Sequence, residues 1–282
     1  MKTRTPTMNL CAVPLTSRSL GRAPDRRRSP WTASIVTGIV VLAAALHASS
    51  SQATIIASDS AANYSGSSFI STNGGTGFQL WTSSLTGGGG SYRGSTGLGS
   101  TTFGIYAGGG ANNSFTAYRQ FDNALTVSST FSVDIGTTSI ASGGSVGVLF
   151  FASGVERGAL FFDGGSSFWQ WNGGGGAIVT SIPFGSVNLD LARLSTNGYS
   201  LALAQGATTQ TITGTFLSSG NPTSSAINEV GFFSSAQGGG ENFGFDNLEI
   251  AAVPEPHTPL IVGAGACAMI PVFLRRRRRP NR

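Results

Sequence analysis

Short runs in which apolar and small polar residues alternate, separated by clusters of glycine, are the feature that most limits what this chain can fold into. Phe131, Val133 and Ile135 form one such run, and Val146 and Phe150 lie in another. Successive side chains of a β-strand point to opposite faces, so this spacing puts each apolar set on one side of a sheet. The central part of the chain is therefore predicted to form many short strands joined by glycine-rich turns.

These candidate strands, with no competing long helical pattern, predict an all-β fold. Many evenly spaced strands favour a two-sheet β-sandwich or jelly roll, in which each sheet buries one face, and a concanavalin-like sandwich is the first expectation. A β-helix is the alternative, although no fixed repeat length supports it. The candidate strands are residues 54–58, 78–82, 101–107, 115–121, 126–135, 145–152, 158–163, 167–172, 187–194, 198–204, 208–217, 227–234 and 242–250.

Residues 1–53 have the order of a signal peptide. Arg26 to Arg28 precede an apolar run at 35–46 that is short for a membrane span, and small residues lead up to Ala53 at the positions that a signal peptidase reads. We predict general secretion with cleavage after Ala53. Twin-arginine export is a minor alternative, and translation from Met8 is another possibility for this long leader.

Residues 253–282 combine three features in a set order. A Pro-Glu-Pro motif precedes an apolar stretch at 258–274, and a run of arginines follows. Arginines directly after an apolar segment stop transfer and stay on the cytoplasmic side, so residues 54–252 are predicted to form one domain that faces outward. The sorting residues are Val253, Pro254, Glu255, Pro256, Arg275, Arg276, Arg277, Arg278 and Arg279.

This order of motif, membrane helix and arginine cluster resembles the PEP-CTERM sorting signal. The resemblance covers only the tail, and it departs from the usual pattern through Cys267 and Pro271 within the helix. It implies that an exosortase recognises the tail, that the protein is held transiently in the inner membrane of a Gram-negative bacterium, and that it then reaches the cell surface or extracellular matrix. Such bacteria make extracellular polysaccharide, which is the expected partner.

The body of the chain is similar to a glycine-rich β-sandwich domain seen on exported proteins of such bacteria. The segments that carry this resemblance are residues 58–64, 74–78, 103–107, 117–119 and 143–147. The resemblance implies a lectin-like or laminin-G-like fold and no established activity.

Subtracting the two targeting segments changes the charge and the chemistry of the chain. The whole sequence has a net charge of +5, whereas residues 54–252 hold four arginines and ten carboxylates, a net charge of −6. Without a basic face, nucleic-acid binding is not expected. Both cysteines, both histidines and the lysine lie outside residues 54–252, so disulfides, Ser-His-Asp or Cys-His catalysis and His-ligated zinc are excluded, and no cofactor is expected.

Carboxylate chemistry is what remains, and glycoside hydrolysis needs two carboxylates at a fixed separation. Concanavalin-like hydrolases carry them as Glu-x-Asp-x-x-Glu, a string that is absent here; residues 246–249 (Asp-Asn-Leu-Glu) are the nearest approach. The chain is therefore predicted to be a non-enzymatic, exopolysaccharide-associated structural or carbohydrate-binding protein. A divergent glycoside hydrolase on the same fold is the alternative.

Two aromatic positions are candidate glycan contacts. Trp169 and Trp171 share one face of their strand, with Phe168 on the other, so they either stack on sugars or complete the core, and core packing is favoured. Tyr118 and Arg119 are the second position, where the arginine either binds an acidic sugar or, more often, pairs with a nearby Asp.

Calcium is the one metal that a body without His or Cys could bind. Asp59 and Asp246 are weak candidates, because sandwich domains often bring their first and last strands together. No dense Asp-x-Asp string supports the site, and no bound metal is predicted.

Overall fold

The computed structural model describes residues 53–218, 226–235 and 242–252. Apart from Ala53, the predicted signal peptide lies outside the described residues, as does the whole predicted sorting tail with its membrane helix and arginines. Within the described ranges, no helix is long and apolar enough to cross a membrane.

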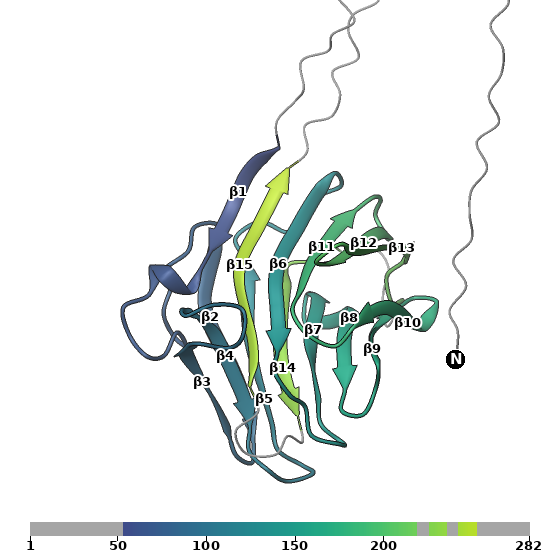
Figure 1. The fold of residues 1–282 in the computed structure, drawn as a ribbon. Coiled ribbons are helices and arrows are strands. Elements are labelled where there is room, and N and C mark those ends of the chain that lie inside the picture. The colour runs from purple at the N-terminus through teal and green to yellow at the C-terminus, as the bar shows by residue number, and fades with distance from the viewer. Residues whose placement is uncertain (1–52, 219–225, 236–241, 253–282) are drawn as a thin grey trace, which may run out of the picture. The chain divides into compact units, whose positions relative to one another are not determined.

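Two antiparallel sheets face each other (Figure 1). Sheet A has the order β13-β12-β11-β6-β15-β4-β3, with β1 also paired to β15, and sheet B has the order β10-β9-β8-β7-β14-β5-β2. Sheet A contains β1 (Thr54–Asp59), β3 (Gly89–Gly94), β4 (Thr102–Ala107), β6 (Ser129–Thr137), β11 (Val187–Arg193), β12 (Gly198–Gln205), β13 (Thr208–Thr215) and β15 (Phe243–Ala252). Sheet B contains β2 (Phe78–Thr86), β5 (Ser114–Phe121), β7 (Ser145–Ala152), β8 (Val155–Asp163), β9 (Phe168–Gly173), β10 (Gly176–Pro183) and β14 (Glu229–Ser235).

The core lies between the sheets, where the alternating apolar residues meet. Phe131, Val133 and Ile135 of β6 are fully buried, as their spacing predicts. The rings of Phe232 in sheet B and Phe245 in sheet A stack with centroids 3.8 Å apart and planes 7° apart. The predicted all-β two-sheet sandwich is confirmed, and the β-helix alternative is wrong because the described strands pair antiparallel across two facing sheets.

The first and last strands lie side by side, as expected. β1 pairs with β15 from Thr54 opposite Ala252 to Asp59 opposite Leu248. A single turn of 3-10 helix, η1 (Ala61–Asn63), follows β1, and the described residues include no α-helix. The described chain therefore begins and ends at the same end of the sandwich (Figure 1).

Candidate functional site

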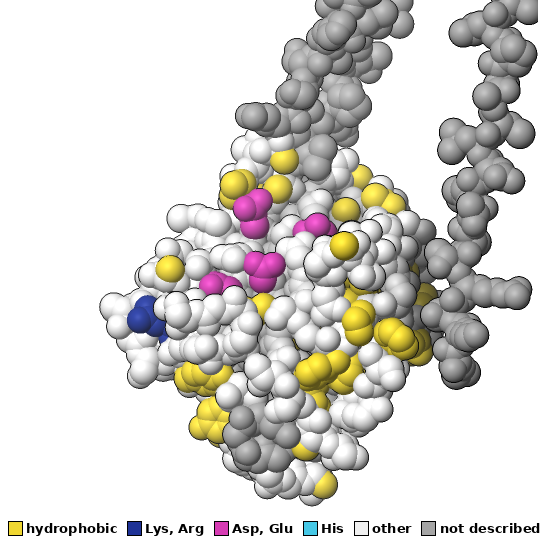
Figure 2. Space-filling model, in the orientation of Figure 1, with side chains coloured by type: hydrophobic (Ala, Val, Ile, Leu, Met, Phe, Trp, Pro, Cys, Tyr) yellow, Lys and Arg dark blue, Asp and Glu magenta, His cyan; other side chains and the backbone are white. Residues whose placement is uncertain are grey.

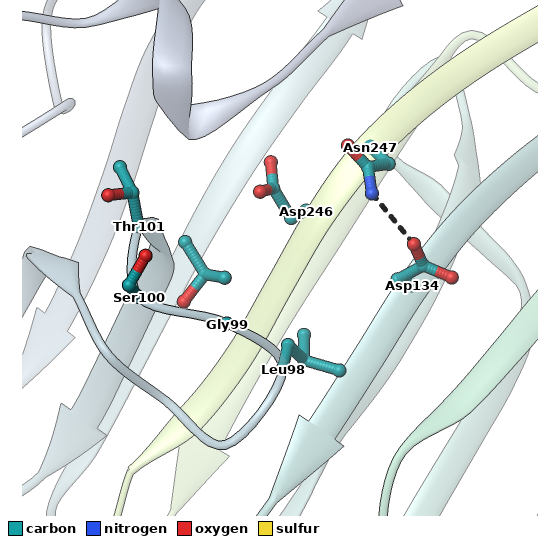
Figure 3. Close-up of a pocket in the computed structure, with 8 residues that line it drawn as sticks. Leu98, Gly99, Ser100, Thr101, Asp134, Asp246 and Asn247 are labelled. Carbon is teal, nitrogen blue, oxygen red and sulfur yellow. Dashed lines mark hydrogen bonds between the residues drawn. The ribbon is translucent and has the colours of Figure 1, made fainter.

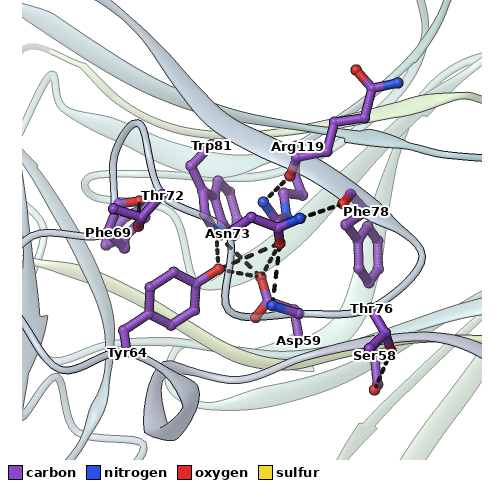
Figure 4. Close-up of polar contacts among 12 residues, drawn as sticks. Ser58, Asp59, Tyr64, Phe69, Thr72, Asn73, Thr76, Phe78, Trp81 and Arg119 are labelled. Atoms are coloured by element: carbon purple, nitrogen blue, oxygen red, sulfur yellow. Dashed lines mark hydrogen bonds and ion pairs between the residues drawn. The ribbon is translucent and has the colours of Figure 1, made fainter.

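A buried ion pair joins the two sheets near the start of the domain (Figure 4). Nη2 of Arg119, on β5, lies 2.7 Å from Oδ2 of Asp59, on β1, and both side chains are fully buried. The same oxygen accepts hydrogen bonds from the Tyr64 hydroxyl (2.8 Å) and the Trp81 indole N–H (3.2 Å). The predicted sugar contact at Arg119 is therefore wrong, because water and ligands cannot reach the guanidinium; the alternative, pairing with a nearby Asp, is confirmed.

Aromatic rings surround the guanidinium of Arg119. Its central carbon lies 5.4 Å from the ring centroid of Phe78 and 5.0 Å from that of Trp81, within cation–π range. Burial nevertheless raises the pKa of Asp59 and lowers the pKa of Arg119, because loss of hydration outweighs their attraction. Burial also raises the pKa of Tyr64 to about 12. The cluster therefore links the two sheets, although burying its charged groups costs them their hydration.

The tryptophan pair on β9 belongs to the core. Trp169 and Trp171 are completely buried, and the indole N–H of Trp171 donates to the Tyr199 hydroxyl at 2.6 Å. Phe168, on the other face of the strand, is exposed. The sugar-stacking role predicted as one option for the tryptophans is wrong, because the facing sheet covers both rings. The favoured interpretation, core packing, is confirmed.

The two candidate calcium ligands do not share a site. Asp59 points into the sandwich and is bound to Arg119, whereas Asp246 lines a hollow on the outer side of sheet A and accepts the Ala61 backbone N–H at 2.8 Å. The described residues contain no group of three His, Cys, Asp or Glu side chains that could hold a metal ion. The predicted pairing of these carboxylates around calcium is wrong, because β15 and β1 direct them to opposite faces.

The outer face of sheet A carries a pair of facing carboxylates. Asp246 on β15 lies directly opposite Asp134 on β6, and both line an open hollow of about 350 Å³ beside residues 98–102 (Figure 3). Asp134 accepts hydrogen bonds from Asn247 at 2.8 Å and Asn188 at 3.1 Å. Acidic side chains gather over β15, β6 and β11 in Figure 2. Sequence spacing alone does not reveal this pair, since its members are far apart in the chain.

The outer face of sheet B is aromatic. Four half-buried rings lie on four adjacent strands: Tyr118 on β5, Phe233 on β14, Phe151 on β7 and Phe161 on β8. Their strand neighbours in the sequence are buried in the core, so these rings point outward. We call these four residues the aromatic face. Tyr118 alone was predicted as a candidate, and the three phenylalanines were missed.

Two glycines allow these rings to lie against the sheet. Gly231 on β14 sits between Tyr118 and Phe151, whose ring centroids are 5.9 Å apart. A Cβ atom added to Gly231 would lie 3.3 Å from the Tyr118 ring and 3.1 Å from the Phe151 ring. At Gly147 on β7, an added Cβ would lie 2.7 Å from the Phe233 ring. The rings therefore cover the glycines and form a low surface instead of standing upright.

Amide side chains border the aromatic face. Gln120 on β5 donates to Glu229 at 3.0 Å, and Gln170 on β9 donates to Asp163 at 3.1 Å. Each of these amides retains an oxygen atom that can accept a hydrogen bond. The border therefore offers neutral donors and acceptors beside the rings.

The arginines of the described chain are withdrawn from the surface. Arg119, Arg157 and Arg193 are buried, and Arg93 is half-buried on β3 of sheet A, where it donates to the Ala61 carbonyl at 3.3 Å. Among the described residues, neither outer face therefore presents a freely exposed cation.

Comparison with known proteins finds no family and only distant solved structures. No family model matches the chain, and no curated protein sequence matches it. Among solved structures, one from work on endo-acting O-glycanases of human gut bacteria is 12% identical, covers 71% of this chain and 99% of its own, and has a TM-score of 0.48. A glycosyl hydrolase family 16 protein of Mycobacterium smegmatis is 11% identical over 70% and 100% of the two chains, with a TM-score of 0.43. The Ulex europaeus lectin UEA-II, complexed with galactose, is 8% identical over 72% and 100%, with a TM-score of 0.37.

Proposed function

We propose that residues 54–252 form a non-enzymatic, concanavalin-like carbohydrate-binding module that associates with extracellular polysaccharide. The signal peptide exports the protein, and an exosortase sorts it through the tail to the cell surface or matrix. The observation that carries the binding role is the aromatic face, backed by Gly147 and Gly231 on the outer side of sheet B.

The chemistry of a sugar ring fits this face. A pyranose exposes C–H groups on one side and hydroxyl groups around its rim. The C–H groups bury apolar area against an aromatic ring, and the hydroxyl groups need neutral donors and acceptors such as Gln120 and Gln170 beside it. Because the body is acidic and its described arginines are withdrawn, the favoured ligand is a neutral glycan and not a polyanion.

Retention of the purified protein on the host's extracellular polysaccharide, compared with neutral glycans, tests this function. Phe151→Ala and Phe233→Ala should each weaken binding by about 1 kcal/mol, roughly fivefold, for each stacking ring that is removed. Tyr106→Ala is the matched control, since it removes an exposed ring from sheet A, and it should bind as the wild type does.

Gly231→Ala separates stacking from fold stability. The atoms nearest to the new methyl group are ring edges at 3.1–3.3 Å, so the rings must move outward while the backbone keeps its pairing. Binding should fall while the melting temperature changes little. Unchanged retention in all three variants (Phe151→Ala, Phe233→Ala and Gly231→Ala) would exclude the aromatic face as the glycan site. Variants that change the oligomeric mass of the protein without any loss of retention would exclude it as well.

A glycoside hydrolase is the second candidate, favoured by the facing carboxylates of Asp134 and Asp246 beside an open hollow. Residues directly opposite each other on adjacent strands have Cβ atoms about 5 Å apart. Their side chains are thus close enough for the carboxyl groups to adopt the separation of roughly 5–10 Å that two-carboxylate hydrolysis uses. Release of reducing sugar by the wild type would favour the enzyme over the binding module if it is lost in Asp134→Asn, a variant that keeps Phe233 and the rest of the aromatic face.

A further inference from the structure

We infer that the end of the sandwich from which residue 253 continues is a docking surface for the lipid bilayer. Four aliphatic side chains at this end are largely exposed: Ile55 (59%), Ile56 (46%), Val127 (48%) and Leu194 (55%). We call these four residues the aliphatic tip. The inference rests on the sorting tail of the proposed function and adds a surface of the folded domain to it.

Strand pairing brings the aliphatic tip together. Ile55 lies opposite Ala251, and Ala252 lies opposite Ser129, the first residue of β6. The loop that carries Val127 then meets the end of β11, because the Ser128 N–H donates to the Arg193 carbonyl at 2.9 Å. Four neighbouring strands span about 15 Å at roughly 4.8 Å per strand. Apolar side chains are visible at this end of the molecule in Figure 2.

Arg193 fixes the two loops of the aliphatic tip from below. Its buried guanidinium donates to the carbonyl oxygens of Leu125 (2.6 Å), Ser195 (3.1 Å) and Thr196 (3.2 Å). These carbonyls flank Val127 on one loop and Leu194 on the other. The short segments that form the tip, 54–58, 126–128 and 194–197, contain no charged side chain. The surface is therefore preformed and apolar, and the α-amino group that cleavage after Ala53 leaves on Thr54 is the one charge that these segments carry.

The predicted tail leaves directly from this surface. β15 ends at Ala252, and the apolar stretch begins at residue 258, so five residues separate the folded domain from the predicted membrane segment. Even fully extended, a link of this length reaches only about 20 Å. The aliphatic tip is thus held close to the bilayer, where exposed aliphatic side chains gain free energy by leaving water for the boundary between headgroups and acyl chains.

Fluorescence from a single label in the full chain tests the docking. The protein carries Cys11→Ser and Cys267→Ser, with Leu194→Cys labelled by an environment-sensitive dye, and is reconstituted in vesicles of phosphatidylcholine and phosphatidylglycerol. Ser142→Cys, in the exposed loop that follows β6 at the opposite end, is the matched control. We expect blue-shifted emission at position 194, with quenching by brominated lipid several-fold greater than at position 142.

A charged variant supplies the second measurement. Ile56→Asp in the Leu194→Cys protein should return the emission of the label toward its value in water, while the chain stays in the vesicle. Equal quenching at positions 194 and 142 would overturn the docking and leave the sorting tail intact. Quenching that appears only at high protein density would indicate a second copy as the occupant and would also overturn it. Failure of the chain to insert would overturn the tail and the docking together, while glycan retention by the aromatic face would be unaffected.

Discussion

Removing the positive charge of Arg119 should strongly destabilise the domain. Arg119→Met keeps an aliphatic side chain of similar length but leaves the Asp59 carboxylate buried without its cation. Breaking a buried pair from one side costs about 3–5 kcal/mol, and loss of the two cation–π contacts adds to this. For a domain of this size, 1 kcal/mol shifts the melting temperature by about 2–4 °C, so we expect a fall of roughly 10 °C or more.

The double variant separates the pair from its surroundings. Asp59→Leu with Arg119→Met removes both charges, and the Trp81 indole N–H keeps its 3.0 Å hydrogen bond to the Tyr64 hydroxyl. Because desolvation dominates the pKa shifts of both partners, the double variant should be more stable than either single variant. Urea unfolding of the four proteins gives the coupling energy, which we expect to exceed about 2 kcal/mol. Single variants that lose less than about 1 kcal/mol, or losses that simply add, would refute this reasoning.

Four further predictions concern the core, the pH dependence and the targeting segments. Trp169→Ala and Trp171→Ala should each lower the free energy of unfolding, measured in urea, by about 3–5 kcal/mol, because each leaves a cavity in the core. The pKa of Tyr64 is about 12 in the folded chain and 10 in its ordinary state, so its stabilising effect is complete below pH 10 and is lost as the pH rises through 12; urea unfolding at rising pH should show a steeper loss for wild type than for Tyr64→Phe. Circular dichroism of residues 54–252 in chelator should show a cooperative melt of a β-rich fold, and a melt that requires calcium would contradict it. Deleting the host's exosortase should leave uncut precursor in the membrane, and an unchanged C-terminus by mass spectrometry would rule out the sorting proposal.

The strands were predictable where one face is apolar and the other polar. All thirteen predicted strands are present, with bounds that differ by a few residues, and the structure adds β3 and β10. β3 has the sequence Gly-Gly-Ser-Tyr-Arg-Gly and β10 is exposed along most of its length, so neither shows the alternation that marks a half-buried strand. Both lie at the edge of a sheet, where little of the core constrains the sequence.

The aromatic face was harder to predict, because period-two spacing defines two faces without saying which one is buried. On β14, Phe232 stacks in the core while Phe233 lies outside, and on β9 the order is reversed, with Phe168 outside and Trp169 inside. Both faces of these strands carry aromatic residues, so composition does not distinguish them. Only the pairing of β5, β14, β7 and β8 shows that the outward rings are neighbours.

The two glycines of the aromatic face, Gly147 and Gly231, have different structural reasons. Glycine inside a strand is less stable than alanine by about 0.5–1 kcal/mol, and both positions lie in central strands. Gly147 has a structural reason, because an added Cβ would lie 2.2 Å from the Leu160 carbonyl oxygen. Gly231 has no such backbone neighbour among its nearest contacts, which are the rings of Phe151 and Tyr118. An alanine methyl group at Gly231 would push against both rings without touching the backbone, so the glycine at this position lets two aromatic rings lie close to the sheet.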